Sequence, residues 1–213
     1  MERGRFLVLE GIDGCGKTTQ RQALADWLPG SGLMPPGASL RLTREPGGSA
    51  LGVALRELLL HPPGDLAPCP EAELLLYAAD RAQHVRQCIE PALAAGDWVL
   101  SDRFSGSTAA YQGHGRGLPL PTIHTLERIA TGGLVPDLTL WLDLPLEESL
   151  RRRGHRPADR IEAAGEAFLG RVQAGFAQLA AERQWWRIDA AAAPEAVSEA
   201  CRGALRERFG SHG

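Results

Sequence analysis

Residues 5–20 read RFLVLEGIDGCGKTTQ, and this stretch decides the fold of the 213-residue chain. It begins with a short apolar run, which predicts a buried β-strand over residues 5–10. Residues 11–18 then fit the pattern G-x-x-x-x-G-K-[ST]. A helix is predicted over 16–28, where Pro29-Gly30 ends it. A strand before this pattern and a helix after it are the context in which such glycines form a phosphate-binding loop.

The chemistry of this loop follows from its backbone. Glycines let successive N–H groups point into one concavity that binds phosphate oxygens, and the following helix adds its N-terminal dipole. Lys17 is expected to reach the β- and γ-phosphates, and the Thr18 hydroxyl to hold Mg²⁺. Lys17 is also the only lysine among 23 basic residues, so the one position that keeps lysine is the one that this motif requires. The residues predicted to bind ATP are Gly11, Ile12, Asp13, Gly14, Cys15, Gly16, Lys17 and Thr18.

The rest of the chain alternates apolar runs with helix-like segments. Further strands are predicted at 40–43, 98–101, 138–142 and 185–188. Helices are predicted at 52–60, 71–95 with a kink near Pro91, 146–153, 166–182 and 194–208, with a short helix after residue 101 and a loop at 113–121. This alternation predicts one α/β domain over residues 1–213, with a parallel sheet covered on both faces.

Composition excludes several classes of protein. The 44% apolar and 23% charged residues are typical of a globular protein, and no run of 18 apolar residues predicts a membrane span. The apolar run Phe6 to Leu9 is too short for a signal-peptide core. A net charge of −3 provides no basic field, so no nucleic-acid partner is expected. Four scattered cysteines without metal-ligand spacing indicate reduced thiols and a cytoplasmic location.

The phosphate-binding loop by itself does not specify an enzyme. GTPases with this loop read guanine through N-K-x-D, which is impossible in a chain that contains no asparagine. Large ATPases need a longer chain. Small kinases, a few ligases and nucleotide-dependent partner switches remain.

Charged residues follow two other predicted strands, at the edge where open α/β sheets bind ligands. Asp102 is a candidate general base or magnesium ligand, and Arg103 is a candidate to bridge phosphates, although an exposed ion pair would look the same. Asp143 ends another strand and is interpreted as structural. Arg44 is a candidate to hold the phosphate of an acceptor, with a turn built on Pro-Gly-Gly as the alternative.

Two helical features suggest how an acceptor is bound. Tyr77 and Arg81 are four residues apart and share a helix face, so they are able to stack on a base and to hydrogen-bond its carbonyl. The alternative is ordinary packing beside a surface charge. Residues 151–160 hold five arginines against one acid. This segment is interpreted as a mobile flap over transferring phosphates, with a solvated helix end as the alternative. A nucleic-acid patch is a third, weaker interpretation, because no aromatic residue is interleaved within the segment.

Several stretches together resemble the bacterial thymidylate kinase family. They are FLVLEGIDGCGKTTQ (6–20), TREPGGS (43–49), LLLYAADRAQHV (74–85), SDRFSGSTAAYQGHGRG (101–117), PDLTLWLD (136–143) and DRIE (159–162). The resemblance implies a five-stranded parallel sheet flanked by helices, an arginine-rich lid at about residues 150–165, and a homodimer. It also implies phosphoryl transfer from MgATP to dTMP, giving dTDP.

Roles are carried over from the resemblance residue by residue. It implies that Arg44 and Arg103 hold the dTMP phosphate and that Asp13 lies near the deoxyribose 3′-hydroxyl or a magnesium-bound water. The residues implied to contact the base and sugar are Tyr77, Arg81, Thr108, Tyr111 and Gln112. The catalytic residues expected from motif and resemblance together are Asp13, Lys17, Arg103, Arg153 and Arg156. The expected magnesium ligands are Thr18 and Asp102, from their places in the sequence, and Glu162, from the resemblance.

Two positions distinguish variants within the family. Some members carry a basic residue inside the loop where this chain has Gly14, so here the lid arginines are expected to supply that charge. Tyr77 stands where Phe is frequent and adds a hydroxyl to the base pocket. The rival interpretations are a small kinase acting on another nucleotide or nucleoside, and an ATP-dependent partner switch.

Overall fold

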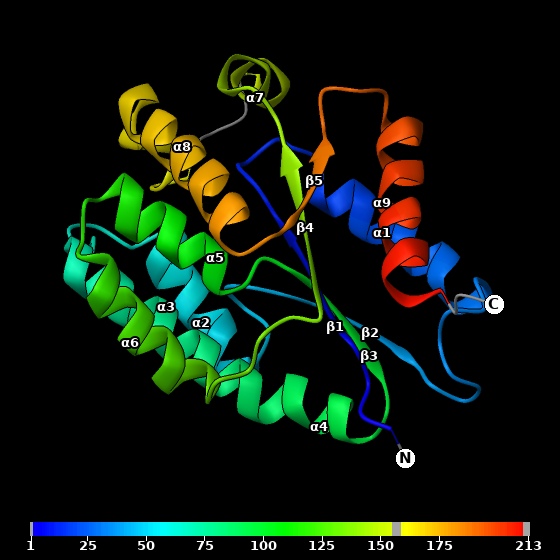
Figure 1. The fold of residues 1–213 in the computed structure, drawn as a ribbon. Coiled ribbons are helices and arrows are strands. Elements are labelled where there is room, and N and C mark those ends of the chain that lie inside the picture. Colours follow the sequence, from blue (N-terminus) through cyan, green and yellow to red (C-terminus); the bar gives the residue numbers. More distant parts are fainter. Residues whose placement is uncertain (1, 155–158, 211–213) are drawn as a thin grey trace.

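The computed structural model describes residues 2–154 and 159–210 and contains one parallel sheet of five strands. The strand order is β2-β3-β1-β4-β5, with β1 at the centre (Figure 1). The strands are β1 (Phe6–Glu10), β2 (Leu40–Arg44), β3 (Trp98–Asp102), β4 (Leu138–Asp143) and β5 (Trp186–Asp189). The predicted fold class is confirmed, and each predicted strand agrees to within about one residue at either end.

Helices cover both faces of this sheet (Figure 1). On one face lie α1 (Lys17–Trp27) and α9 (Pro194–Phe209), which pack against each other. On the other face lie α2 (Ala50–Leu60), α3 (Pro70–His84), α4 (Glu90–Ala94), α5 (Ser105–Thr108), α6 (Leu120–Thr131) and α8 (Glu166–Glu182). The helix α7 (Leu146–Arg153) lies above the carboxyl ends of the strands.

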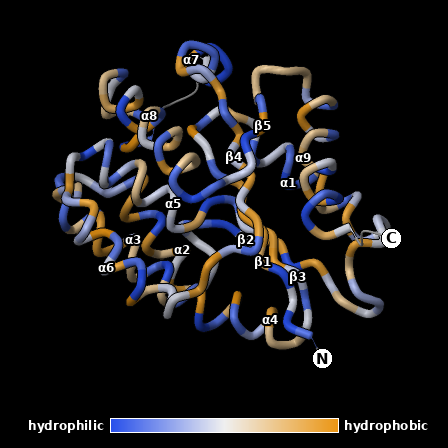
Figure 2. Tube along the Cα trace, viewed as in Figure 1, coloured by the Kyte–Doolittle hydropathy of each residue, from blue (hydrophilic) through white to orange (hydrophobic). Residues whose placement is uncertain are grey.

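The central strand shows why the sheet is covered on both sides. All five residues of β1 are buried. Phe6 and Val8 belong to a cluster with Val85 and Ile89 beneath α3 and α4, whereas Leu7 belongs to the larger core. Alternate side chains of a strand point to opposite faces, so a strand that is apolar at every position must be buried on both. Figure 2 shows the resulting hydrophobic centre.

The structure corrects two sequence-based expectations about helices. The helix α6 was not predicted: a loop was expected over 113–121 and no element over 122–131. Pro121 instead lies in the first turn of α6, where its missing N–H costs nothing. The predicted helix over 71–95 is divided by a π-helical turn at Val85–Ile89. Pro91 cannot donate to the carbonyl four residues earlier, and the wider turn accommodates that loss.

The connections after two neighbouring strands create the site. The loop after β1 leads to α1 on one face, whereas the chain after β3 leads to α5 on the other (Figure 1). Because β1 and β3 are paired, a crevice opens between their carboxyl ends, which is where such sheets bind ligands. Within residues 2–154 and 159–210, none of the helices combines the length and hydropathy needed to cross a bilayer.

Candidate active site

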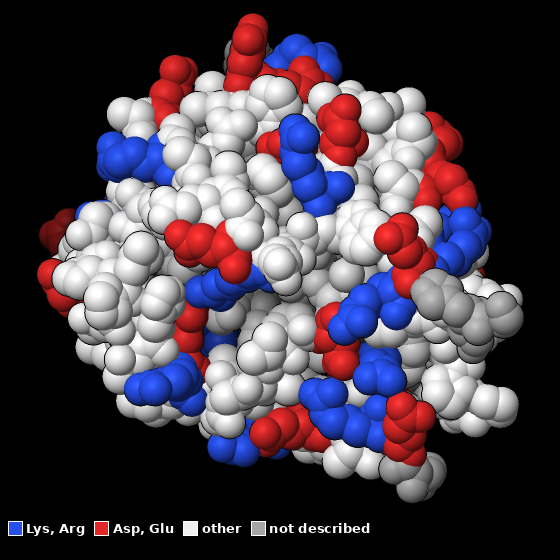
Figure 3. Space-filling model, viewed as in Figure 1, with Lys and Arg blue, Asp and Glu red and all other residues white. Residues whose placement is uncertain are grey.

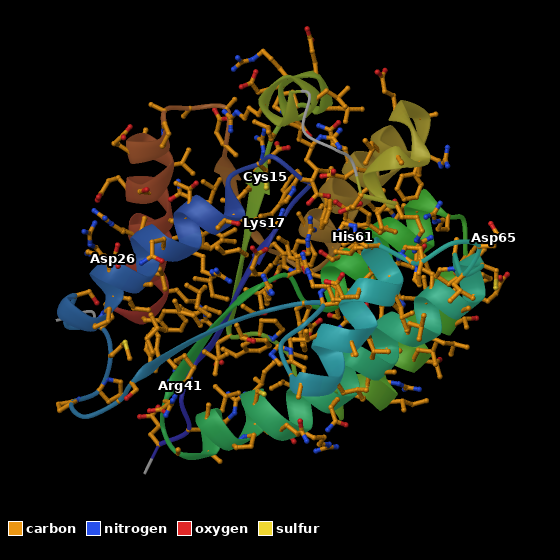
Figure 4. The ribbon with its side chains drawn as sticks, turned by 180° about the vertical axis from the view of Figure 1, so that it is seen from behind. Cys15, Lys17, Asp26, Arg41, His61 and Asp65 are labelled. Carbon is orange, nitrogen blue, oxygen red and sulfur yellow. The ribbon has the colours of Figure 1, made fainter. Side chains whose placement is uncertain are left out.

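The loop between β1 and α1 has the backbone of a phosphate cradle. Gly14 and Gly16 adopt φ angles of 80° and 95°, a left-handed conformation that only glycine adopts without strain. Gly11 also has a positive φ, of 142°, and is needed for a second reason, since a Cβ there would lie 2.7 Å from the Leu142 carbonyl oxygen. Figure 4 shows Cys15 and Lys17 at the carboxyl ends of the strands, beneath α7. The glycines therefore let the loop curl tightly against β4.

Lys17 is held inside this loop. Its side chain is buried, and Nζ donates to the carbonyl oxygens of Gly11 and Ile12, at 2.9 Å each. These two acceptors offset the cost of burying an ammonium group. A phosphate placed in the loop would supply stronger, charged acceptors for the same protons.

Asp13 and Arg103 form the ion pair at the centre of the crevice. Arg103 Nη2 donates to Asp13 Oδ1 (2.6 Å), and the Tyr111 hydroxyl donates to Asp13 Oδ2 (2.8 Å). Burial by itself would raise the pKa of Asp13, but the charges of Arg103 and Lys17 and these hydrogen bonds outweigh it and hold the pKa well below its usual range. Asp13 is thus a permanent anion, suited to orienting groups and not to accepting a proton.

Arg103 spans the two halves of the crevice. Its Nη1 donates to the Gly11 carbonyl oxygen and to the Ser107 hydroxyl, at 2.9 Å each. Its backbone has φ 74°, which is uncommon for a non-glycine residue and is characteristic of functional positions. This conformation turns the chain at the end of β3, and the guanidinium lies between the phosphate-binding loop and α5.

Glu10, which the sequence analysis did not single out, fixes the start of α5. Its carboxylate accepts from the backbone N–H groups of Phe104 and Ser107 (3.0 Å each) and from the Ser107 hydroxyl (2.6 Å). Burial raises the pKa of Glu10, although these hydrogen bonds and Arg103 oppose that shift. A carboxylate at the N-terminal end of a helical segment satisfies free N–H groups, and this one ties α5 to β1.

Beside Arg103 lies a pocket between α3 and α5. The predicted acceptor residues Tyr77, Arg81, Thr108, Tyr111 and Gln112 all line it, together with Asp13 and Arg103. The remaining lining residues, which were not predicted, are Glu45, Pro46, Arg56, Leu60, Phe104, Ser107, Asp159 and Ile161. These residues come from segments far apart in the sequence, so local pattern gave no signal for most of them.

Hydrogen bonds fix the far wall of this pocket. Arg81 Nη2 donates to Thr108 Oγ1 (2.9 Å), and Gln112 Nε2 donates to the buried carboxylate of Glu73 (2.7 Å). Burial, followed by the negative charge of Glu73, raises the pKa of Tyr77 well above its ordinary value. The Tyr77 ring is therefore neutral and offers an aromatic face.

Arginines gather at the other end of the pocket. Arg44 is exposed at the end of β2 and makes no pocket contact, whereas Arg56 lines the pocket and donates to the Pro46 carbonyl oxygen (2.9 Å). Burial and the nearby charge of Arg44 lower the pKa of Arg56. Several guanidinium groups close enough to perturb one another indicate a site for an anion.

The lid approaches the phosphate-binding loop through α7. Ser149 Oγ donates to the Asp13 carbonyl oxygen (2.6 Å). A Cβ on Gly14 would lie 3.1 Å from the Ser149 carbonyl oxygen and 3.4 Å from Arg153 Cγ. The absence of a side chain at position 14 thus lets Arg153 lie over the loop. Arg156, also predicted to be catalytic, lies outside the described residues.

The predicted magnesium ligands lie on three segments. Thr18 is exposed at the start of α1, Asp102 is half-buried at the end of β3, and buried Glu162 lies 3.8 Å from Arg153. Among the described residues, no three His, Cys, Asp or Glu side chains converge on one point. Thr18 and Asp102 are nonetheless oxygen donors beside the loop, which fits an ion that takes most of its ligands from phosphates and water.

Surface charge is mixed on the face shown in Figure 3, where arginines and acidic residues alternate without a broad patch of one sign. The cations of the crevice do not belong to this surface, since Lys17 and Arg81 are buried and Arg103 is half-buried.

A five-stranded parallel sheet with a lysine-bearing phosphate loop, facing an arginine-lined pocket, defines the class of P-loop nucleotide kinases. A family model described as thymidylate kinase matches residues 9–201. The chain therefore belongs to the thymidylate kinase family, as the resemblance implied.

Individual relatives agree with this assignment. The chain is 72% identical over 203 residues to "Thymidylate kinase" of Synechococcus sp. (strain WH7803), covering 95% of each chain. It is 68% identical over 207 residues to "Thymidylate kinase" of Prochlorococcus marinus (strain MIT 9313), covering 97% of this chain and 96% of the relative. Among solved structures, the thymidylate kinase of Ehrlichia chaffeensis matches with a TM-score of 0.75 and 30% identity, over 96% of this chain and 99% of the other.

Proposed function

We propose that this chain transfers the γ-phosphoryl group of MgATP to dTMP, forming dTDP, with ATP on residues 11–18 and dTMP in the pocket between α3 and α5. The family supplies the reaction and ATP as donor. One observation carries the assignment of sites: Arg103 contacts Gly11 and Asp13 on the donor side and Ser107 and Tyr111 on the acceptor side. A group in that position bridges the two phosphates between which transfer occurs.

The donor site uses backbone and charge. Amide groups of the loop bind phosphate oxygens, and Lys17 exchanges its two carbonyl acceptors for the β- and γ-phosphates. Thr18 and Asp102 would hold Mg²⁺, with Glu162 as a more distant candidate. When bound, the ion neutralises developing phosphate charge.

The acceptor site separates its charged end from its base end. Arg44, Arg56 and Arg103 attract the phosphate, and Asp13, held by Tyr111, orients the sugar. Tyr77 stacks on thymine, and Arg81 donates to its O4. Thr108 and Gln112 complete the wall along the base. Tyr111 hinders the 2′ position and so favours deoxyribose.

The lid completes the site when both nucleotides are bound. Arg153 already lies over Gly14, from where it is proposed to contact the transferring phosphoryl group; Arg156 is proposed to join it. Because phosphoryl transfer needs little covalent assistance, the protein acts by aligning the two phosphates and supplying positive charge. Closure also excludes water, which would otherwise hydrolyse ATP.

Two further proposals concern the oligomeric state and the cellular location of the protein. Large exposed apolar side chains occur on three neighbouring helices, with Leu51 and Leu58 on α2, Leu75 on α3 and Ile129 on α6. Such a face suits a second copy of the chain, so we propose a homodimer.

The cysteines at positions 15, 69, 88 and 201 are all free thiols, which supports a cytoplasmic location.

An acceptor panel tests the proposed function. MgATP is supplied with dTMP, dUMP, dCMP, AMP, thymidine or shikimate, and ADP release is measured. The expected result is the highest kcat/KM with dTMP and none with thymidine, which lacks the phosphate. Preference for another acceptor would favour the rival small kinase. Slow hydrolysis without any transfer would favour a partner switch.

A further inference from the structure

A buried chain of polar side chains lies behind the base end of the acceptor pocket. It runs from Thr43 at the end of β2 through His84 and Arg81 of α3 to Thr108 of α5, with Glu45 at its centre. Glu45 is 4% exposed, Arg81 2% and His84 0%. Charged side chains that are this deeply buried must be paired, so the partners of each side chain in this polar chain fix its geometry.

Glu45 joins the two α3 residues through separate oxygens. Arg81 Nε donates to Glu45 Oε2 (2.8 Å), and His84 Nδ1 donates to Glu45 Oε1 (2.9 Å). Since a carboxylate only accepts, Nδ1 must carry a proton. His84 Nε2 then lies 2.6 Å from Thr43 Oγ1, which completes the contacts of the ring.

The remaining bonds of Arg81 leave one of its amino groups for a ligand. Of the five guanidinium N–H groups, Nε–H serves Glu45, and Nη2 donates to the Phe104 carbonyl oxygen (3.2 Å) and to Thr108 Oγ1 (2.9 Å). Nη1 has no partner within the part of the chain that the structure describes, and Arg81 lines the acceptor pocket. The guanidinium plane is therefore fixed on two sides, with two donors available on the third.

The loop that carries Glu45 is fitted closely to α3. A Cβ on Gly48 would lie 2.3 Å from His84 Nε2, and Gly47 N–H donates to Asp80 Oδ1 (3.1 Å). A residue with a side chain at position 48 would displace the imidazole. The glycines of this turn thus allow His84 to come close enough to reach Glu45.

We infer that Glu45 and His84 are positioning residues, which fix the Arg81 guanidinium so that the pocket selects a pyrimidine with a carbonyl group at position 4 and rejects one with an amino group. This inference rests on the proposed function, in which Arg81 faces the base. Arginine only donates hydrogen bonds, and an amino group at position 4 of the base is also a donor. The two donors would face each other, and Arg81 Nη1 would be left without an acceptor. A guanidinium held on two sides cannot turn away to relieve that conflict.

Two substitutions of His84 separate the hydrogen bond from the packing. The amide nitrogen of asparagine occupies about the position of Nδ1, so His84→Asn keeps a donor for Glu45. The amide nitrogen of glutamine occupies about the position of Nε2, so His84→Gln keeps the contact with Thr43 and loses the hydrogen bond to Glu45. Glu45→Gln is a third variant of unchanged shape, which cannot accept from both Arg81 and His84.

The experiment measures kcat and KM with dTMP, dUMP and dCMP at saturating MgATP, together with the KM for ATP and the Tm. We expect Glu45→Gln and His84→Gln to lower the dTMP/dCMP ratio of kcat/KM roughly 10- to 100-fold, mainly through KM for dTMP. The dTMP/dUMP ratio is expected to stay unchanged, because both bases carry the 4-carbonyl. His84→Asn is expected to keep the wild-type dTMP/dCMP ratio to within about threefold.

Three outcomes would overturn the inference. A lower Tm with equal losses for dTMP and dCMP would mean that the chain only stabilises the fold. Equal loss of selectivity in His84→Asn and His84→Gln would assign the effect to the imidazole ring and not to its bond with Glu45. Wild-type selectivity in all variants would show that the position of Arg81 does not depend on Glu45 or His84. A wild-type chain that does not phosphorylate dTMP would instead refute the proposed function, and this inference with it.

Discussion

Replacing Arg103 by lysine keeps the positive charge in the crevice but removes the planar fork. In the structure this fork makes hydrogen bonds to Gly11, Asp13, Ser107 and Tyr111 at 2.6–3.3 Å. A lysine ammonium reaches one or two of these acceptors at a time. The substitution therefore tests bridging by the fork separately from charge.

The expected magnitude follows from the bonds that the fork would transfer to phosphate. If two charge-assisted hydrogen bonds to phosphoryl oxygens are lost in the transition state, at about 1.5–2 kcal/mol each, the barrier rises by roughly 3–4 kcal/mol. That corresponds to a decrease in kcat/KM for dTMP of about 10²- to 10³-fold. The KM for ATP should change little, because Lys17 and the loop amides remain.

A coupled assay of ADP release at saturating MgATP gives kcat and KM for dTMP. Thermal unfolding of the same samples shows whether the substitution also destabilises the fold. Arg86→Lys is the matched control, since Arg86 is an exposed arginine whose ion pair is made with Glu90, four residues further along the chain. The bridging role of Arg103 would be refuted by Arg103→Lys with kcat/KM within about threefold of wild type.

Three further predictions address single groups. Tyr77→Ala should raise the KM for dTMP roughly tenfold or more while the KM for ATP stays near wild type, since base stacking contributes about 1–3 kcal/mol; a change confined to ATP would reverse the assignment of the pockets. Arg153→Ala should lower kcat more than it lowers dTMP affinity, as steady-state kinetics and dTMP titration would show; equal losses would make the lid a binding element. Burial and the nearby charge of Glu45 raise the pKa of Asp80 to about 6, so the native state holds more protons than the unfolded chain between about pH 4 and 6, and stability falls as pH rises through that window. Asp80→Asn should remove this cost, raising the free energy of unfolding by about 1–3 kcal/mol at pH 7.5 and little at pH 4; urea titrations that show the same difference at both pH values would contradict this reasoning.

Hydrogen bonds within the chain keep the cations of the crevice paired. Lys17 is satisfied by loop carbonyls, and Arg103 by Asp13 and the Gly11 carbonyl. Each of these partners is weaker than a phosphate group, except for Asp13, which stays in place as an anchor. Under the proposed function, nucleotide binding would exchange these internal acceptors for external ones at little electrostatic cost.

The sequence by itself determined the phosphate-binding loop, the alternation of strands and helices, and the family. These features are local: the loop residues 11–18 are consecutive, and each strand is an uninterrupted apolar run whose limits its own residues set. Tyr77 and Arg81 were predicted to share a face from helical spacing alone, and both line the pocket.

Only the tertiary structure decided the order of the strands, the left-handed backbone of Arg103 and the partners of its side chain. It also decided that Glu45, 36 residues before Arg81, fixes that guanidinium, and that Arg56 lines the pocket. No periodicity or motif marks such residues, because their roles come from contacts across the sheet and between helices that the chain folds together from distant positions. Local pattern specifies which segments form, whereas the geometry of the site depends on where packing places their ends.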